Sequence, residues 1–331
     1  MKQVAATALI LLLLLFLIPL LFFRGGSLLG GEEEEEIPVL TPAPSGPLDT
    51  ETTITVSQPD GTVETMALGD YLWRVVAAEM PASFEEEALK AQTVAARTYA
   101  MRRMANPPAA HPDAAVCTDH TCCQAYITPE SAASNWGDKA EYYTAKIKNA
   151  VSGTDGVVAL YNGAYIDAVF FSSAAGRTVD AVEVWGNSVP YLTGVDSPEG
   201  EEVPNWHSTV TITAQEFKDT FLAAHLEADL SGDPSGWFGT PEYNSAGGVS
   251  TIPVGGVTVK GTEMRALFSL RSVNFTVAVF GDEITFSVTG YGHGVGMSQY
   301  GANAMAKEGK TYQEILQWYY TEITLDTISD S

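Results

Sequence analysis

The N-terminus carries a long uninterrupted apolar run, residues 4–23, which contains no charged side chain. A helix needs about 20 apolar residues to cross a bilayer, whereas the apolar core of a cleaved signal peptide is usually shorter. The run therefore predicts a single transmembrane helix within an N-terminal anchor, residues 1–24. A cleaved signal sequence is the alternative. We expect an uncleaved anchor and an extracellular body, because a start-transfer segment with a very short head normally exports the rest of the chain.

A helical pattern begins near residue 70 and stops at a proline. Glu79 falls at helical spacing on the same face as Leu72, Val75 and Val76. Pro81 is expected to end this helix, because the residue before a proline disfavours helical geometry. The carboxyl group of Glu79 therefore belongs to an apolar face at a helix C-terminus.

A second helical pattern follows at once, with small side chains on its buried face that permit close packing. Its predicted face consists of Phe84, Ala88, Ala91, Ala95 and Thr98. Ser83 is the expected N-cap of this helix, with Glu86 completing a capping box. Asp70 is the expected N-cap of the preceding helix.

The remaining pattern is dominated by short strands. Residues 52–68 predict a hairpin that turns at Asp60-Gly61. Alternating or short apolar runs predict further strands within residues 156–173, 210–217, 272–280 and 283–290, an insertion loop within 226–248, and a last helix after 290–296. Because strands outnumber helices and the long helices lie toward the ends, we expect an α+β fold of mixed helices and antiparallel strands.

Residues 25–50 separate the anchor from this body. They contain a run of five glutamates, 32–36, followed by four prolines among mostly small side chains. Such a composition cannot bury a core, so the segment is expected to be an extended, mobile linker. The folded domain is then residues 51–331.

The chain is strongly acidic, with 41 Asp and Glu against 17 Lys and Arg, a formal net charge of −24 over 331 residues. Such a surface repels phosphate backbones, so nucleic acid is excluded as an expected partner.

Two influences are expected to oppose ionisation of Glu79: its apolar face, and the negative end of the helix dipole. Both would raise the pKa of this carboxyl group. A carboxyl that stays protonated near neutral pH is suited to act as general acid in glycosidic cleavage. Alternatively, Glu79 points to water or pairs with Arg97.

Three segments carry a family resemblance: residues 71–100, "SSAAGRTVDAVEVWG" at 172–186, and "GYGHGVGMSQYGANAMAKEGKTYQEILQWYY" at 290–320. In the same order they closely resemble motifs of the stage II sporulation protein D family of peptidoglycan lytic transglycosylases, to which the amidase enhancers are related. The similarity covers roughly residues 65–325.

The resemblance implies cleavage of peptidoglycan glycan strands between N-acetylmuramic acid and N-acetylglucosamine, in engulfment during sporulation. Strands whose stem peptides an amidase has removed are the implied substrate. It also implies a cell-wall amidase and a membrane scaffold as partners, and a location at the cell membrane facing the septal space. The alternatives are a non-catalytic glycan-binding enhancer of an amidase, and a muramidase that uses water.

Glu79 occupies the position of the catalytic acid/base in the family motif A-[AG]-E-M-P. One carboxylate suffices if the C6 hydroxyl of the substrate attacks the anomeric carbon, which leaves a 1,6-anhydro end. Ordinary glycosidases use two carboxylates. Asp167, Asp180 and Glu183 remain candidates for a second one.

The resemblance implies sugar contacts in the helix pair and in the second and third motifs. The expected residues are Arg97, Ser172, Ser173, Arg177, Thr178, Trp185, His293, Gln299 and Tyr300. The second motif departs from the family pattern S-x-S-G-G-[RK]-T-E at Ala174, Ala175 and Val179. Trp185 has a core position as its alternative, and the glycine-rich third motif has tight packing as its alternative. That motif lacks the G-K-[ST] ending of a phosphate loop.

The three cysteines fall within seven residues of one another, just after a histidine. The resemblance implies a zinc site of two histidines and two cysteines here, and the present chain offers His111, Cys117, Cys122 and Cys123, with His120 as a substitute ligand. Four soft ligands suit tetrahedral zinc in a closed, structural site. One disulfide with a third free thiol is the alternative.

Overall fold

The computed structural model describes residues 37–328, and these belong, from residue 40 onward, to one compact unit. The predicted anchor and the glutamate run of the linker lie outside the described residues. Over residues 37–328, none of the helices combines the length and apolar character that a membrane span requires.

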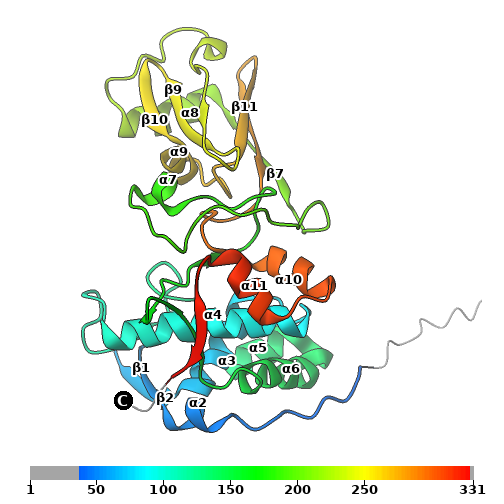
Figure 1. Ribbon diagram of the computed structural model, residues 1–331. Coiled ribbons are helices and arrows are strands. Elements are labelled where there is room, and N and C mark those ends of the chain that lie inside the picture. Colours follow the sequence, from blue (N-terminus) through cyan, green and yellow to red (C-terminus); the bar gives the residue numbers. More distant parts are fainter. Residues whose placement is uncertain (1–36, 329–331) are drawn as a thin grey trace, which may run out of the picture. The chain divides into compact units, whose positions relative to one another are not determined.

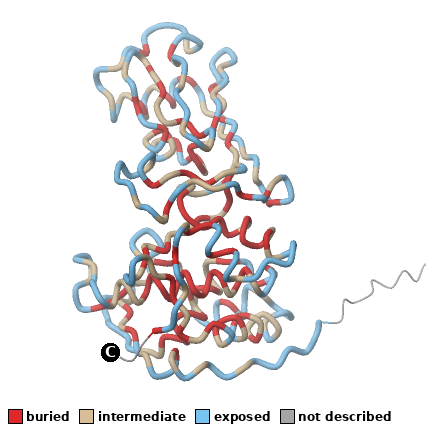
Figure 2. Tube along the Cα trace, in the orientation of Figure 1, coloured by how far each residue is buried: buried red, intermediate tan, exposed pale blue. Residues whose placement is uncertain are grey.

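Two hydrophobic cores organise the unit, and buried positions concentrate inside each of them (Figure 2). The chain builds most of the first core, then the second, and returns to complete the first (Figure 1). The first core is formed by α2 (Pro47–Glu51), β1 (Thr53–Ser57), β2 (Val63–Ala67), α3 (Leu68–Glu79), α4 (Glu86–Ala105), β3 (Val116–Cys117), α5 (Pro129–Trp136), α6 (Ala140–Ser152), β4 (Val157–Tyr161), β5 (Ala164–Tyr165), β6 (Phe170–Phe171), α7 (Ala181–Trp185), β13 (Met297–Ser298), α10 (Gln299–Lys307), α11 (Tyr312–Tyr319) and β14 (Thr324–Thr327).

Helix α4 lies at the centre of the first core and packs against α3, α6, α10, α11 and β4. Its alanines at 88, 91, 95, 96 and 100 are fully buried. Side chains of that size let several helices approach α4 closely, as the sequence pattern predicts.

The second core contains two three-stranded antiparallel sheets, in the orders β10-β9-β8 and β11-β12-β7, together with two helices. Its elements are β7 (His207–Thr213), α8 (Ala214–Ala224), β8 (Glu242–Tyr243), β9 (Val249–Val254), β10 (Val257–Lys260), α9 (Gly261–Leu267), β11 (Phe275–Phe280) and β12 (Glu283–Thr289). Phe217 is fully buried at its centre, and its ring stacks on Phe268 with centroids 4.8 Å apart. Trp237 from the predicted insertion loop joins the same cluster, so that loop contributes to a core.

Most strand pairs are antiparallel, and the α+β prediction is confirmed. Two short pairs are parallel: β1 with β3, and β6 with β13. The hairpin predicted around Asp60-Gly61 forms as β1 and β2.

Four local expectations are wrong. The N-caps of α3 and α4 are Ala67 and Glu85, neither with a side-chain cap, so Asp70 and Ser83 do not cap. The strand expected within residues 210–217 ends at Thr213, where a capping box with Glu216 starts α8. Two helices, α10 and α11, follow the third motif where one was expected.

The end of the predicted linker is folded. Residues Pro47–Glu51 form helix α2, and Asp49 is fully buried. The Nε and Nη2 atoms of Arg97 donate to the two carboxylate oxygens of Asp49 at 2.8 and 2.5 Å. Arg97 is itself fully buried, so it is wrong as a sugar contact and as a partner of Glu79. It attaches α2 to α4.

Candidate active site

Glu79 is the last residue of α3, where the chain turns away before Pro81. The backbone N–H of Ala125 donates to its Oε1 atom at 2.6 Å. Burial raises the pKa of the Glu79 carboxyl above its ordinary value, and it outweighs the Ala125 hydrogen bond and the nearby His120, which act in the opposite direction. The predicted direction of the shift is confirmed, with burial as its main cause.

Glu79 lines a pocket of about 270 Å³. The residues around it are Glu79, Tyr99, His120, Cys123, Gln124, Ala168, Val169, Phe170 and His293. Among these described residues, Glu79 carries the single carboxyl group. The three other candidates are not among the lining residues. The Oδ1 atom of Asp167 lies 3.9 Å from Arg102 Nε, Asp180 accepts from the N–H of Gly194, and Glu183 accepts from Ser245.

His293 lines the same pocket but is not free to move a proton. Its Nε2 atom lies 3.1 Å from the carbonyl oxygen of Phe170, and its Nδ1 atom accepts from the N–H of Val295 at 3.1 Å. Both ring nitrogens are therefore occupied in the neutral Nε2–H tautomer. Burial lowers the pKa of His293 to about 4, so the ring is uncharged near neutral pH.

Tyr99 and Gln124 also line this pocket, and sequence reasoning missed both. The Oε1 atom of Gln124 accepts from Tyr71, while its buried Nε2 atom has no hydrogen-bond partner among the described residues. Tyr99 lies on α4, with the guanidinium of Arg103 stacked 4.8 Å from its ring centroid. The one available signal was the position of Gln124 directly after the cysteine cluster.

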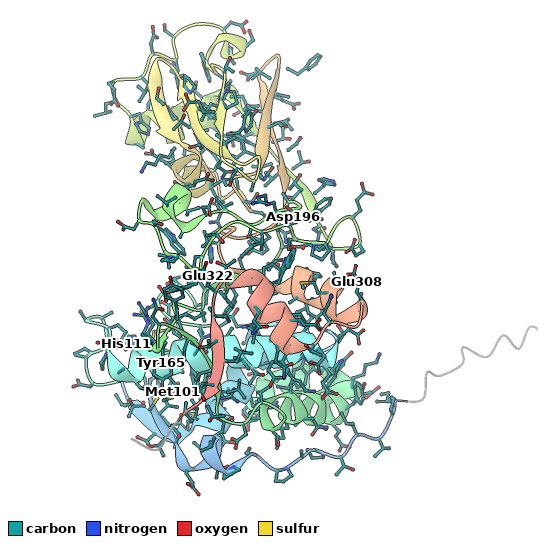
Figure 3. The ribbon with its side chains drawn as sticks, in the orientation of Figure 1. Met101, His111, Tyr165, Asp196, Glu308 and Glu322 are labelled. Atoms are coloured by element: carbon teal, nitrogen blue, oxygen red, sulfur yellow. The ribbon has the colours of Figure 1, made fainter. Side chains whose placement is uncertain are left out.

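The four expected metal ligands come together beside this pocket. The ligand atoms of His111, Cys117, Cys122 and Cys123 all lie within 4.8 Å of one another, and His111 Nε2 is 3.3 Å from Cys123 Sγ. Figure 3 labels His111, the nitrogen donor of this set. One nitrogen and three sulfur atoms at this separation fit a tetrahedral zinc ion. His120 lies outside the set and lines the Glu79 pocket, so its expected place as a ligand is wrong.

The three thiols are free in the structure. Cys123 belongs both to the ligand set and to the pocket lining. The segment from Cys117 to Ala125 therefore joins the ligand set to the N–H group that contacts Glu79.

The second motif is held largely by its own backbone and by buried partners. Thr178 is fully buried and its hydroxyl bonds to Val195, so it is wrong as a sugar contact. Ser173 is also buried and pairs with Tyr291 through two backbone hydrogen bonds. Arg177 donates to Asp196 at 2.7 Å.

The structure places the expected sugar contacts Gln299, Tyr300 and Trp185 in different surroundings. Gln299 is buried and its Nε2 atom donates to the backbone oxygen of Glu79 at 3.0 Å, so it positions the helix end. The N–H of Tyr300 donates to the carbonyl of Ser172. Trp185 is 44% exposed, with its ring 5.7 Å from that of His293, and is accessible for stacking on a sugar.

Two glycines of the third motif allow its backbone to pack closely against residues 169–171. Gly292 has φ +126°, and a Cβ atom there would lie 2.6 Å from the Cβ of Phe171. At Gly296 a Cβ would lie 2.2 Å from the carbonyl oxygen of Val169. The motif must therefore be glycine at both positions to pack against residues 169–171.

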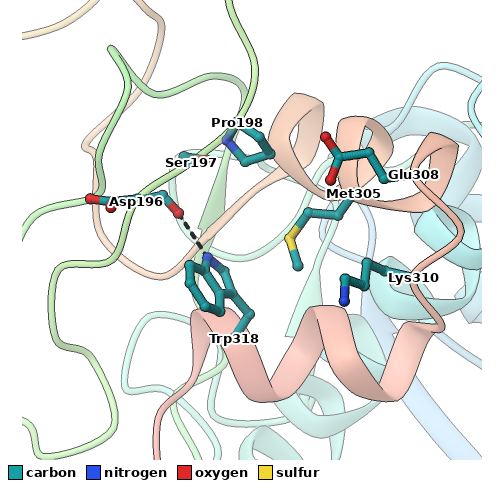
Figure 4. A pocket seen from close by; sticks show the side chains of 7 residues that line it. All are labelled: Asp196, Ser197, Pro198, Met305, Glu308, Lys310 and Trp318. Atoms are coloured by element: carbon teal, nitrogen blue, oxygen red, sulfur yellow. Dashed lines mark hydrogen bonds between the residues drawn. The ribbon is translucent and has the colours of Figure 1, made fainter.

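A separate pocket of about 280 Å³ lies against α10 and α11 (Figure 4). Its lining residues are Asp196, Ser197, Pro198, Met305, Glu308, Lys310 and Trp318. The Trp318 indole N–H donates to the backbone oxygen of Asp196 at 2.7 Å. Neither Glu79 nor a ligand of the cysteine cluster lines it, so it lies outside the candidate active site.

Comparison with known proteins shows the family of the chain. The stage II sporulation protein family matches residues 58–161. The chain is 40% identical to stage II sporulation protein D of Bacillus subtilis (strain 168) over 260 residues, which is 78% of this chain and 74% of that protein. It is 37% identical to the protein of the same name from Bacillus amyloliquefaciens, over 80% of this chain and 75% of the relative. An amidase enhancer of Bacillus subtilis (strain 168) is 30% identical, over 76% of this chain and 39% of its own length. The chain therefore belongs to the stage II sporulation protein D family of sporulation proteins.

Proposed function

We propose that this chain is a lytic transglycosylase that cleaves peptidoglycan glycan strands between N-acetylmuramic acid and N-acetylglucosamine. Its substrate is a strand whose stem peptides have been removed, here called a denuded strand. The observation that carries the proposal is a single carboxyl group, Glu79, with a raised pKa in a pocket.

In the proposed reaction, the carboxyl group of Glu79 carries out both proton transfers. The protonated carboxyl of Glu79 donates to the glycosidic oxygen as the bond to the anomeric carbon breaks. The C6 hydroxyl of the same muramic acid attacks that carbon, and the Glu79 carboxylate takes up the hydroxyl proton. The products are a 1,6-anhydro end and a free hydroxyl on the leaving sugar, and Glu79 is protonated again without consuming water.

The pocket supports this division of roles. A raised pKa favours the protonated form of Glu79 before cleavage, which is the form that a general acid requires. A hydrolase of the ordinary two-carboxylate kind would need a second carboxyl group across the pocket.

The cysteine cluster is proposed to hold one structural zinc ion. His111, Cys117, Cys122 and Cys123 would supply all four ligands, which leaves no open position for activated water. When bound, the ion would fix the 117–125 segment, and so the N–H of Ala125 against Glu79.

We further propose a setting for this activity: the membrane-bound machinery of engulfment, facing the septal space, with a cell-wall amidase and a membrane scaffold as partners. The amidase enhancer relative supports the amidase as a partner. Removal of stem peptides by an amidase would supply the denuded strand.

The product ends test the proposal. Purified glycan strands are treated with amidase, incubated with the full-length chain, and analysed by mass spectrometry. We expect muramic acid ends lighter by one water than reducing ends, the mass of a 1,6-anhydro ring. Reducing ends would replace the transglycosylase with a muramidase. Uncleaved strands, together with faster amidase action on intact glycan, would make the chain a non-catalytic enhancer.

A further inference from the structure

A third cavity, of about 420 Å³, is lined by positively charged side chains although the chain as a whole is strongly negative. Its lining residues are Thr262, Arg265, Ala266, Ser269, Leu270, Arg271 and Tyr291. Two of these described residues are arginines and none is acidic, in a chain of net charge −24.

Neither arginine forms a salt bridge with a described carboxylate, unlike Arg97 and Arg177, which pair with aspartates. The guanidinium of Arg271 lies 4.3 Å from the ring centroid of Tyr291, and its buried Nε atom has no hydrogen-bond partner among the described residues. Arg265 donates from Nε to the carbonyl of Leu270 at 3.3 Å. Its other two guanidinium nitrogens make no hydrogen bond within the described part of the chain.

Partly desolvated cations without a counter-ion favour an anionic ligand. A guanidinium presents N–H donors in a planar fork that matches the two oxygens of a carboxylate. Tyr291 is 45% exposed, so its ring offers an apolar surface to a sugar beside the two cations.

The arginine cavity continues toward Glu79 along the third motif. Tyr291 lines this cavity, and His293, two residues later, lines the Glu79 pocket. Arg265 lies close enough for its charge to act on His293. Residues 291–293 therefore connect the lining of the arginine cavity to the lining of the Glu79 pocket.

We propose that Arg265 and Arg271 bind the lactyl carboxylate of a muramic acid from which the stem peptide has been removed. The inference rests on the proposed function and names the feature of the substrate that the chain recognises. In an intact strand this carboxyl group is an amide without charge. Two unpaired guanidinium groups thus distinguish a denuded strand from an intact one.

Binding is measured with the full-length chain carrying Glu79→Gln, so that no strand is cleaved. The ligands are denuded muramic acid oligosaccharides, the same oligosaccharides with each carboxyl converted to a methylamide, stem-peptide-bearing oligosaccharides, and chitooligosaccharides, which lack the lactyl group. Arg265→Gln and Arg271→Gln are each added, with Lys218→Gln on α8 as the control for loss of one positive charge. Thermal melting of each variant confirms that it is folded.

We expect each arginine variant to bind denuded oligosaccharides about tenfold more weakly, the factor that one charge-assisted hydrogen bond is worth. Binding of methylamides and chitooligosaccharides should not change, and Lys218→Gln should change neither. Arg271→Lys, which keeps the charge without the fork, should lose less than Arg271→Gln.

Three outcomes would overturn the proposal. Denuded and methylamide oligosaccharides could bind the parent chain equally. The arginine variants could lose affinity equally for chitooligosaccharides. Stem-peptide-bearing oligosaccharides could bind more tightly than denuded ones, which would assign the arginines to a peptide carboxylate. Because no cleavage is measured, these outcomes are independent of whether the chain is a transglycosylase.

Discussion

At the scale of single residues, burial gives Glu79 a carboxyl group that holds its proton at higher pH than an exposed glutamate does. The folded chain then binds this proton more tightly than the unfolded chain. Consequently the contribution of Glu79 to the free energy of unfolding is most favourable below the ordinary glutamate pKa of 4.5, and it is lost as pH rises through the raised pKa.

Glu79→Gln removes this titration, so the variant should gain stability relative to the parent chain as pH increases. The measurement is the free energy of unfolding in urea for both proteins, at a series of pH values from about 4 to about 8. The quantity compared is the free energy of unfolding of the variant minus that of the parent chain, which should increase with pH. A value that stays constant or decreases with rising pH would contradict a raised pKa for Glu79.

The pair of Asp49 and Arg97 supports a second prediction. Asp49→Asn leaves the Arg97 guanidinium fully buried without a counter-ion, so the free energy of unfolding should fall by about 3–5 kcal/mol. Asp196→Asn is the matched control, because Asp196 also pairs with an arginine but is 81% exposed. Its cost should be at most about 1 kcal/mol. Equal losses in urea unfolding would show that burial does not decide the effect.

The sequence predicted the buried environment of Glu79 but not the partner of Arg97, for a physical reason. The environment of Glu79 follows from its own helix face, which local spacing describes. The partner of Arg97 lies 48 positions away in a segment that resembles a linker by composition. Nothing local to either residue indicates that they meet.

At the scale of elements, the 117–125 segment connects the cysteine cluster to the pocket of Glu79. Metal binding to such a site is part of the folding free energy. We expect about one zinc ion per chain under reducing conditions. A chelator should lower both the melting temperature and the rate of strand cleavage, because the ordered segment also holds Ala125 against Glu79.

The metal content and the free thiols of the purified protein test this prediction. Elemental analysis gives the zinc stoichiometry, and thiol titration before and after chelation gives the number of free cysteines. Cys122→Ser should reproduce part of the loss of stability. A metal-free protein with a disulfide from Cys117 to Cys122 or Cys123 would refute the zinc site.

Element boundaries were harder to predict than element types. The helix pair and the first hairpin formed where expected, because their patterns are long or contain a strong turn signal. The end of β7 was misread although Thr213 and Glu216 have capping-box spacing, because the apolar alternation of Val210 and Ile212 continues at Ala214, past the end of the strand. The expected cap at Ser83 failed because the chain completes a turn first and α4 begins at Glu86.

At the scale of the whole molecule, the site is assembled from segments far apart in sequence. Glu79, Gln124 and His293 come from α3, the cysteine segment and the third motif. Sequence spacing cannot predict such a pocket, and the resemblance supplied the two distant motifs without their contacts. The sequence did not predict a second hydrophobic core, because the strands of both cores have the same pattern of short apolar and alternating runs.

The predicted anchor is also tested at this scale. Residues 4–23 are expected to keep the full-length chain in the membrane fraction, while a chain that begins at residue 37 should remain in the supernatant. N-terminal sequencing of the membrane-bound protein should find Lys2. A mature protein that begins after Leu29 would show that the apolar run is a cleaved signal sequence.

The central claim is that Glu79 performs both proton transfers, and one paired measurement tests it most directly. Cleavage of denuded strands and thermal melting are recorded on the same preparations of the parent chain, Glu79→Gln and Glu86→Gln. Glu86 is the control because its carboxyl group is 53% exposed in a surface ion pair with Lys90.

Loss of a general acid/base typically lowers the rate by ~10²–10⁴. Because one residue serves both transfers here, Glu79→Gln should fall at the upper end of this range and melt no lower than the parent chain. Glu86→Gln should cleave at nearly the parent rate. A folded Glu79→Gln chain that releases anhydro-muramic acid ends at the parent rate would contradict the account.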